Sequence, residues 1–461
     1  MPPVSRVVIV GGGPGGYEAA LVAAQLGAEV TLVDSDGLGG SAVLTDCVPS
    51  KTLIATAELM TEVEGAAELG VEVSHDARAA VRVDLARVNA RVLRLARDQS
   101  DDIADRLEHE GVRLLRGRGR LDGPDRVVVT GEHEESLPAD AVLLATGAAP
   151  RTTPQAQPDG ERILTWEQVY GLTELPEHLV VVGSGVTGAE FASAYLALGA
   201  EVSLVSSRER VLPGEDADAA AVLEDALTRR GMHVLAQSRM ASVARAGDTV
   251  TVTLTDGRTI EGSHCILAVG SVPRTPDLGL ETAGVETDER GFVSVDRVSR
   301  TSARGVYAAG DCTGVLMLAS VAAMQGRIAM WHFLGDAVSP LDLKKVSSNV
   351  FTAPEIATVG WSQQAVDRGE IEANQLMLPL AGNARAKMQG VHEGFVKLFC
   401  RPGTGIVVGG VVVAPRASEL IHPVSIAVAQ SMTADQLAQA FTVYPSMSGS
   451  VAEAARRLHQ F

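Results

Sequence analysis

Cys47 and Lys51 are the residues whose types and spacing most suggest redox chemistry in this sequence. They frame the segment CVPSK, which we expect to open a helix, so that the thiol and the ammonium group share one face about one turn apart. Pro49 fits this expectation, because the first N–H groups of a helix lack intrahelical partners anyway. A helix N-terminus also favours the thiolate form of a cysteine. The thiol is therefore a candidate for electron transfer or for covalent chemistry.

A glycine loop near the N-terminus predicts dinucleotide binding. In GGGPGG, Gly11 permits a tight turn, Gly13 lets backbone N–H groups approach a pyrophosphate, and Gly16 lets the following helix pack closely on its strand. Asp34 stands 18 residues after Gly16, at the end of the next expected strand, where it can accept hydrogen bonds from ribose hydroxyls. This context favours a nucleotide site over a purely structural turn.

A second loop, GSGVTG, repeats the three glycines at Gly183, Gly185 and Gly188. Its acid is missing, because the residue 18 positions after the last glycine is Ser206, followed by Ser207 and Arg208. A carboxylate here selects NAD by bonding the 2′-hydroxyl, whereas hydroxyls beside a cation permit contact with a 2′-phosphate. We therefore predict that NADPH is accepted alongside NADH. The alternative is that Arg208 is merely solvated.

Each loop has to be positioned by a strand, a helix and a second strand, and two similar segments provide them. Residues 6–36 and 178–208 each combine a β-branched run, a glycine turn, an amphipathic helix and another strand. Between them, residues 80–110 predict a long helix. A Pro- and Gln-rich connector at 152–162 suits a domain crossing, and from about residue 346 alternating β segments and helices predict an α+β domain.

Composition limits the possible functions. A chain of 461 residues exceeds what one core normally supports. The formal net charge of -18, without a Lys/Arg-rich run, argues against nucleic-acid binding. The histidines and cysteines lack metal-type spacing, and the four scattered cysteines suit a reducing compartment. No signal peptide and no membrane span are expected, so we predict a cytoplasmic protein without a metal.

The quoted motifs together resemble the FAD-dependent pyridine nucleotide-disulfide oxidoreductases, which include dihydrolipoamide dehydrogenase and glutathione reductase. The resemblance covers nearly the whole chain and rests also on LLATGAAPR, GVYAAGDCTG, FTAPEIATVG and GNARAKM. It implies an α/β fold with two Rossmann-like dinucleotide-binding domains, for FAD and NAD(P)H, and a C-terminal α+β dimerisation domain. The expected boundaries are 1–150 and 276–345 for the two parts of the FAD-binding domain, 151–275 for the NAD(P)H-binding domain, and 346–461 for the dimerisation domain.

The resemblance also implies which residues bind the cofactors. For FAD these are Gly11, Gly13, Pro14, Gly15, Gly16, Asp34, Ser35, Gly40, Ser41, Lys51, Thr146, Gly147, Gly310 and Asp311. For NADPH and NADH they are Gly183, Gly185, Val186, Gly188, Glu190, Ser206, Ser207, Arg208 and Gly270. It further implies that Lys51 lies near the flavin N5 edge and pairs with Glu190.

The sequence departs from the family pattern in the parts that reduce disulfides. Ala42 occupies the position of the first, substrate-facing cysteine of the redox pair. Tyr444 and Gly449 occupy the positions of the His-Glu dyad that the partner subunit supplies. Alanine cannot form a disulfide, and a tyrosine hydroxyl is a poor proton shuttle near neutral pH. The family mechanism of dithiol reduction is therefore expected to be absent, as in a member of the family that lacks the redox disulfide.

What remains is hydride transfer from NAD(P)H to FAD, followed by direct reduction of an acceptor. The chain thereby resembles NAD(P)H:quinone reductases of this family, and we expect a homodimer that reduces a small-molecule quinone in a ping-pong reaction. Tyr444, contributed to the partner's flavin site, offers a ring for stacking and a hydroxyl for a quinone oxygen; alternatively, it only fills the space of the dyad.

Cys47 leaves further alternatives open. It is a charge-transfer donor to FAD, a reactive thiol that reduces peroxide or a small disulfide, or an inert buried thiol. A different class of function is a catalytically silent flavoprotein subunit of a dehydrogenase complex. Lys51, Glu190, Cys47 and Tyr444 are thus the predicted catalytic residues.

Overall fold

The computed structural model describes residues 4–71, 81–131 and 134–459. The chain forms two compact units, each of which is described by itself. The first comprises Met1–Thr52, Asn89–Arg151 and Gly270–Asp342, and the second comprises Leu53–Val88, Thr152–Val269 and Leu343–Phe461. The division into three domains at residues 150, 275 and 345 remains a prediction.

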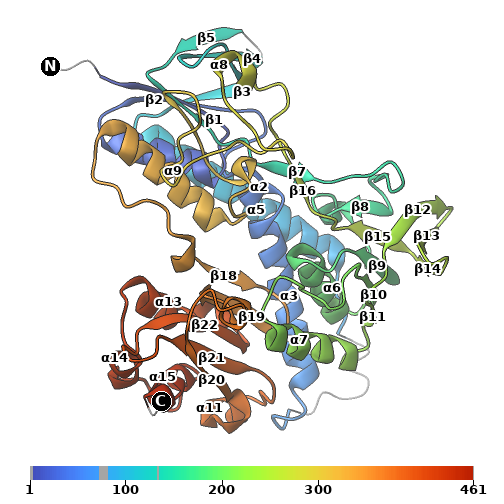
Figure 1. The fold of residues 1–461 in the computed structure, drawn as a ribbon. Coiled ribbons are helices and arrows are strands. Elements are labelled where there is room, and N and C mark those ends of the chain that lie inside the picture. Colours follow the sequence, from blue (N-terminus) through green and yellow to red (C-terminus); the bar gives the residue numbers. More distant parts are fainter. Residues whose placement is uncertain (1–3, 72–80, 132–133, 460–461) are drawn as a thin grey trace. The chain divides into compact units, whose positions relative to one another are not determined.

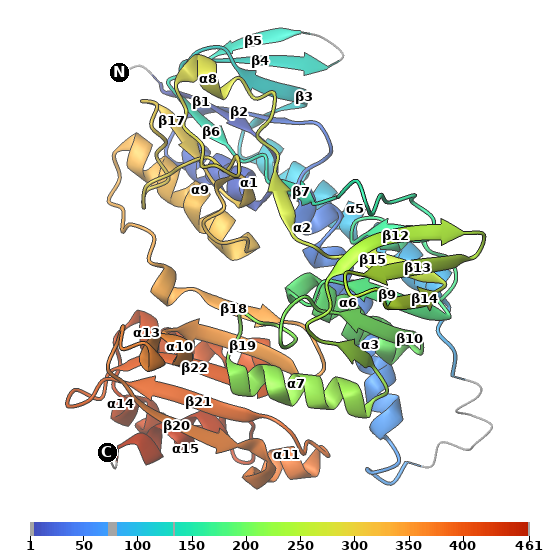
Figure 2. The same cartoon turned by 45° about the vertical axis from the view of Figure 1, so that its right-hand side comes forward.

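The first unit is built on a seven-stranded sheet with the order β17-β6-β1-β2-β3-β4-β5; Figure 1 labels β1 to β5, and Figure 2 labels all seven strands. The strands from β17 to β3 are parallel, and β3, β4 and β5 form an antiparallel meander. Of these parallel strands, β1, β2 and β6 are buried on both faces, which explains their continuous apolar runs. The strand bounds are β1 Arg6–Val10, β2 Glu29–Asp34, β3 Arg113–Leu121, β4 Arg126–Gly131, β5 Glu135–Pro138, β6 Ala141–Leu144 and β17 Val306–Ala308.

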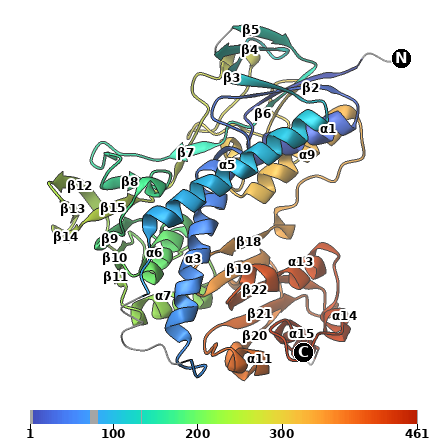
Figure 3. The ribbon, with the colours of Figure 1, turned by 180° about the vertical axis from the view of Figure 1, so that it is seen from behind.

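Two helices, α1 (Pro14–Gln25) and α9 (Ala319–Leu334), lie side by side against one face of this sheet (Figure 3). Glycine makes their contact possible, because a Cβ atom on Gly326 would lie 2.0 Å from the carbonyl oxygen of Gly15. α5 (Leu85–His109) confirms the predicted long helix, although residue 80 lies outside the described residues. α9 therefore packs directly behind the first glycine loop.

The second unit contains a parallel sheet with the order β11-β10-β9-β15-β8 and a separate three-stranded sheet β12-β13-β14 (Figure 1). The strands are β8 Ile163–Thr165, β9 His178–Val182, β10 Glu201–Val205, β11 His233–Leu235, β12 Met240–Ala246, β13 Thr249–Leu254, β14 Thr259–Gly262 and β15 His264–Leu267. α6 (Val186–Leu198) joins β9 to β10, and α7 (Ala217–Arg229) precedes β11. This is the second strand–helix–strand unit expected from the sequence.

The same unit contains a five-stranded antiparallel sheet with the order β18-β19-β22-β21-β20. The strands are β18 Ser347–Val350, β19 Glu355–Gly360, β20 Asn374–Pro379, β21 Phe395–Cys400 and β22 Val407–Ala414. The helices that accompany it are α10 Gln363–Asp367, α11 Ala384–Met388, α12 Ala417–Leu420, α13 His422–Ala429, α14 Ala434–Gln439 and α15 Gly449–Leu458. A single apolar cluster joins this sheet to α13, α14 and α15.

The remaining elements are short connections, apart from α3. They are α2 Gly40–Leu44, α3 Cys47–Gly65, β7 Ala148–Pro150, η1 Val169–Gly171, β16 Ser271–Pro273, α8 Leu280–Ala283, η2 Asp311–Thr313, η3 Leu343–Lys345 and η4 Leu380–Gly382. Within the described ranges, no helix has both the length and the apolarity needed to cross a membrane.

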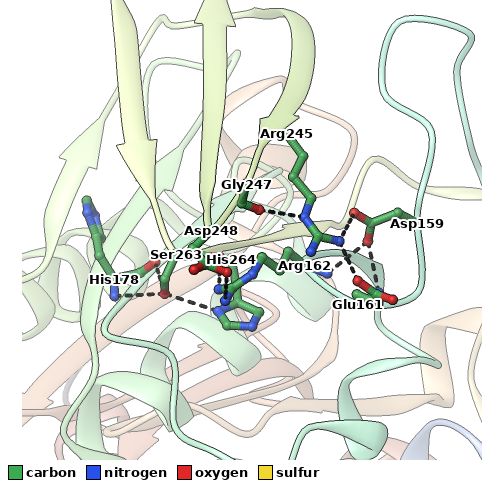
Figure 4. Close-up of polar contacts among 9 residues, drawn as sticks. All are labelled: Asp159, Glu161, Arg162, His178, Arg245, Gly247, Asp248, Ser263 and His264. Atoms are coloured by element: carbon green, nitrogen blue, oxygen red, sulfur yellow. Dashed lines mark hydrogen bonds and ion pairs between the residues drawn. The ribbon is translucent and has the colours of Figure 1, made fainter.

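A polar network organises the start of the second unit's parallel sheet (Figure 4). Asp159 accepts hydrogen bonds from the backbone N–H groups of Glu161, Arg162 and Ile163 at 2.8–2.9 Å. Its other oxygen pairs with Arg245 at 3.1 Å, so the connector is tied to β12. These bonds lower the pKa of Asp159 to about 2, against the opposing effect of burial.

Candidate functional site

The first glycine loop is shaped by two close backbone contacts. Gly11 has a φ of 105°, and a Cβ atom there would lie 2.3 Å from the carbonyl oxygen of Ala145. A Cβ atom on Gly16 would lie 1.9 Å from the carbonyl oxygen of Gly11. Gly13 differs, because the nearest atom to its added Cβ is 4.0 Å away. The loop thus leaves open space at Gly13, before the N-terminus of α1, where a pyrophosphate fits.

Asp34 fixes the other side of this loop. Its carboxylate accepts hydrogen bonds from the backbone N–H groups of Gly12 at 2.6 Å, Asp36 at 2.8 Å and Gly37 at 2.7 Å. The carboxylate joins the end of β2 to the turn before α1 and keeps a negative charge beside the loop.

The second glycine loop repeats these contacts in the second unit. Gly183 has a φ of 112° and lies against the carbonyl oxygen of Ala268, 2.1 Å from an added Cβ atom. A Cβ atom on Gly188 would lie 1.8 Å from the carbonyl oxygen of Gly183, whereas nothing lies within 4 Å of one on Gly185. Both loops therefore fit a dinucleotide in the same way, with one glycine of each facing open space.

The two loops differ in the residue that follows the second strand. Ser206 is fully buried, and its hydroxyl lies 2.7 Å from the Ser184 hydroxyl. It also accepts a hydrogen bond from the Arg208 N–H at 3.1 Å. The Ser184–Ser206 pair thus takes the place of the Gly12–Asp34 pair, and the exposed residues next to it are Ser207 and Arg208. Sequence reasoning missed Ser184, although its place inside the glycine motif was a signal.

The loop before α3 contains one thiol. Ala42 lies in α2, and Cys47 is the first residue of α3, with Lys51 four residues further on. The hydroxyls of Ser41 and Thr45 lie 3.0 Å apart and close the turn between these helices. The predicted helix start at CVPSK is therefore confirmed.

The four cysteines, all within the described residues, form no disulfide, and they differ in exposure. Cys47 is partly exposed, whereas Cys265, Cys312 and Cys400 are buried. Burial raises the pKa of Cys312 to about 11, and its thiol donates to the carbonyl oxygens of Ala309 at 3.3 Å and Leu144 at 3.6 Å. Cys47 is therefore the most accessible of these thiols.

A partly buried carboxyl group, Asp311, follows the last strand of the first unit's parallel sheet. Asp311 opens η2, and burial, followed by repulsion from Asp46, raises its pKa to about 6. The preceding residue, Gly310, donates its N–H to the Gln325 side chain of α9 at 2.8 Å. Gln325 and Asp46 were not predicted, because neither belongs to a sequence motif.

The short strands β7 and β16, with the residues that flank them, are joined by hydrogen bonds inside the first unit. The Thr146 hydroxyl donates to the Arg274 carbonyl at 2.8 Å, and the Arg274 N–H donates to the Gly147 carbonyl at 3.0 Å. The Gly270 carbonyl accepts from the Arg151 N–H at 2.9 Å. These bonds bring β7 and β16 together as a two-stranded crossing.

Glu190 and Tyr444 are both placed in the second unit, in contrasting surroundings. Glu190 is buried in α6, and its carboxylate accepts a hydrogen bond from the Phe351 N–H at 2.9 Å. Its predicted pairing with Lys51 remains a prediction. Tyr444 is 86% exposed and lies beside the exposed side chains of Phe441 and Val443. In the part of the chain that the structure describes, no cluster of metal-ligating side chains is found.

Comparison with known families agrees with this arrangement. A family model described as pyridine nucleotide-disulphide oxidoreductase matches residues 5–326, and the model of that family's dimerisation domain matches residues 346–455. FAD and NAD(P)H are the cofactors of such flavoprotein dehydrogenases, and each glycine loop accordingly has one glycine open to a ligand.

Individual relatives cover nearly the whole chain. It is 55% identical to an NAD(P)H dehydrogenase (quinone) of Mycobacterium tuberculosis, over 99% of this chain and 94% of that protein. It is 35% identical to a dihydrolipoyl dehydrogenase of Chlorobaculum parvum, over 97% and 96% of the two chains. The crystal structure of LpdA from Mycobacterium tuberculosis matches with a TM-score of 0.94 at 55% identity, covering 99% of this chain and 100% of that one. The flavoprotein disulfide reductase RclA of Escherichia coli shares the fold, with a TM-score of 0.86 at 23% identity and coverage of 98% and 99%.

Proposed function

Because this chain belongs to the pyridine nucleotide-disulphide oxidoreductase family, we propose that it is an FAD-dependent NAD(P)H:quinone oxidoreductase. The observation that carries the proposal is the single thiol of the loop before α3, where Ala42 stands five residues before Cys47. A dithiol relay cannot form there, so electrons have to leave the flavin directly. The 55% identical relative, which is itself an NAD(P)H dehydrogenase (quinone), supports a quinone as the acceptor.

The first unit would bind FAD. Gly13 leaves room for the pyrophosphate at the start of α1, and Asp34 would accept hydrogen bonds from the adenosine ribose. Asp311, a partly buried carboxyl group, would bind ribityl hydroxyls. Bound FAD supplies the two-electron chemistry that links the nicotinamide to the acceptor.

The second unit would bind the nicotinamide coenzyme. Gly185 is open to its pyrophosphate, and the exposed Ser207 and Arg208 would contact the 2′-phosphate of NADPH. The buried Ser206 hydroxyl is used within the protein, so its role would be to shape this turn. Glu190, held by the Phe351 N–H, would orient the nicotinamide.

The overall reaction converts NAD(P)H, a quinone and one proton into NAD(P)⁺ and a hydroquinone. The hydride carries two electrons and one proton equivalent, so one further proton has to come from solvent or from a side chain. Tyr444 of the partner subunit would provide a stacking surface and a hydroxyl beside the quinone oxygen. Its exposed ring, within a dimerisation domain, supports a place at the contact between two copies of a homodimer.

As part of the same proposal, we infer that the protein works in the cytoplasm. Four described cysteines without a disulfide suit the reducing conditions of the cytoplasm, where NAD(P)H is supplied.

Pure holoenzyme provides the test. NADH and NADPH should bleach the flavin anaerobically, and menadione should restore its colour. In steady state, menadione should be reduced much faster than lipoamide, oxidised glutathione or hydrogen peroxide. Rapid turnover of either disulfide would contradict the proposal, and a flavin that neither nucleotide bleaches would instead indicate a silent subunit.

A single-thiol reductase is the second candidate, because Cys47 is partly exposed whereas the other three cysteines are buried. Peroxide or disulfide turnover that is lost in Cys47→Ser, with menadione reduction retained, would favour it.

A further inference from the structure

Lys397 is a buried lysine in β21 of the C-terminal sheet, with a side chain only 3% exposed. Its Nζ atom donates to both carboxylate oxygens of Asp216, at 2.9 and 2.8 Å, and to Asp218 at 2.6 Å. The Asp216 side chain is 2% exposed, whereas that of Asp218 is 57% exposed. The ion pair between Lys397 and Asp216 joins residues that are 181 positions apart in the sequence. It therefore links β21 to the start of α7 inside the second unit. Figure 2 shows α7 beside the C-terminal sheet.

Asp216 also ends the segment that precedes α7. As the N-cap of the helix, it accepts hydrogen bonds from the backbone N–H groups of Asp218 at 3.1 Å and Ala219 at 3.2 Å. The carboxylate thus fixes where α7 begins. The neighbouring Glu215 is largely buried, and burial, followed by repulsion from Asp216, raises its pKa. Lys397 is therefore the cation that offsets a group of acidic side chains at this helix start.

The same segment is joined to the second glycine loop at its other end. The Leu212 N–H donates to the Ser184 carbonyl at 2.9 Å, and the Ser206 hydroxyl lies 2.7 Å from that of Ser184. Leu212 has a φ of 50°, a conformation that needs support from such contacts. Residues 206–216, which include Ser207 and Arg208, are thus held by the glycine loop at one end and by Lys397 at the other.

We propose that Lys397 is a positioning residue for the nicotinamide coenzyme, supplied by the C-terminal sheet rather than by the nucleotide-binding sheet. It acts through Asp216, which keeps segment 206–216 in the conformation that presents Ser207 and Arg208 to the adenosine end of NAD(P)H. The proposal rests on the coenzyme site described under the proposed function. A purely structural role is the alternative, because buried ion pairs often stabilise a fold no better than apolar residues of similar volume.

Paired variants separate the two roles. Lys397→Met leaves Asp216 buried without its cation, so this variant is expected to lose stability. The double variant Lys397→Met/Asp216→Asn contains no buried unpaired charge at this site, because the remaining Asp218 side chain is 57% exposed to solvent, so it should recover thermal stability. It still lacks the ionic bond that holds the segment, so its affinity for coenzyme should stay low.

The measurement is equilibrium binding of NADP⁺ and NAD⁺ to the FAD-loaded full-length protein by calorimetry, together with the melting temperature. In the double variant, we expect the dissociation constants for both nucleotides to rise about tenfold. The reason is that binding then has to order a segment that the variant has loosened. Arg162→Met is the matched control, because it removes an ion pair with Asp248 (2.6 Å) in the same unit, outside segment 206–216. The control should lower the melting temperature without changing either dissociation constant.

Unchanged binding in the double variant would overturn the proposal and leave Lys397 a structural residue. Neither quinone nor flavin reduction enters this measurement, so failure of the proposed quinone activity would be seen separately. Binding of both nucleotides that is insensitive to Lys397→Met/Asp216→Asn and also to Arg208→Ala would indicate instead that the assumed coenzyme site is wrong.

Discussion

Coenzyme preference should shift towards NADH when the second glycine loop is given the residue pair of the first. The double variant Ser184→Gly/Ser206→Asp recreates the Gly12–Asp34 pair at the equivalent positions. In the first loop, the Gly12 N–H donates to the Asp34 carboxylate at 2.6 Å, and a Cβ atom on Gly12 would lie 3.1 Å from that carboxylate. Glycine at 184 should therefore make room for an acid at 206.

The expected change in coenzyme preference can be estimated from the charge of the new carboxylate. A new carboxylate about 5 Å from a 2′-phosphate of charge about −2 repels it by about 2 kcal/mol at an effective dielectric constant of about 60, or about 40-fold in affinity. A hydrogen bond from the 2′-hydroxyl of NADH to the same carboxylate contributes about 1.5 kcal/mol, or about tenfold. The ratio of kcat/KM for NADH over NADPH should therefore rise by about 400-fold, the product of these two factors.

The assay is steady-state reduction of menadione with each coenzyme. Ser206→Asp alone is the control: the Ser184 hydroxyl lies 2.7 Å from that of Ser206, so an added carboxylate lacks space. This single variant should lose stability and bind both coenzymes more weakly. An unchanged coenzyme ratio in a stable double variant would refute the assignment of this turn to the 2′-position.

Three further predictions concern other parts of the chain. The pKa of Asp159 is lowered from 3.8 to about 2, so its stabilising effect is complete above about pH 5 and is lost as the pH falls from about 4 towards 2. Denaturant unfolding of Asp159→Asn should therefore show a deficit in the free energy of unfolding of about 1 kcal/mol at neutral pH, since solvent screens this exposed carboxylate, and the deficit should shrink in acid. Gly16→Ala should abolish FAD retention, because its Cβ atom would overlap the Gly11 carbonyl oxygen at 1.9 Å. Gly13→Ala should instead fold normally and lose only FAD affinity. Flavin fluorescence would report both outcomes. N-Ethylmaleimide should label Cys47 on native protein before the three buried cysteines, and mass spectrometry that finds one of these modified first would contradict the burial order.

Much of the nucleotide-binding architecture could be predicted, because its determinants are local in sequence. The turn, the close helix packing and the open position each depend on one glycine, at a fixed distance from a strand and a helix. The second strand follows within the same 31-residue segment, so the position of Asp34 or Ser206 could be counted directly. The helix start at Cys47 was predictable for the same reason.

The residues that sequence reasoning missed act over long distances in the chain. Lys397 looks like an ordinary polar residue of a strand in GFVKLFC, and nothing near it indicates a partner 181 positions away. Gln325 lies 15 positions from Gly310 and has no motif of its own. Such contacts are created by packing of elements, so they become visible only when the fold is known.

The two glycine loops share a backbone arrangement and differ in one pair of side chains. Their backbones make the same contacts, since the added Cβ atoms of Gly16 and Gly188 would meet the preceding glycine carbonyls at 1.9 and 1.8 Å. The backbone therefore cannot distinguish one dinucleotide from another. The difference lies in one pair of positions, glycine with aspartate in the first loop and serine with serine in the second. The first pair leaves a carboxylate at the loop and the second leaves none, and this difference underlies our proposal that the second turn admits a 2′-phosphate.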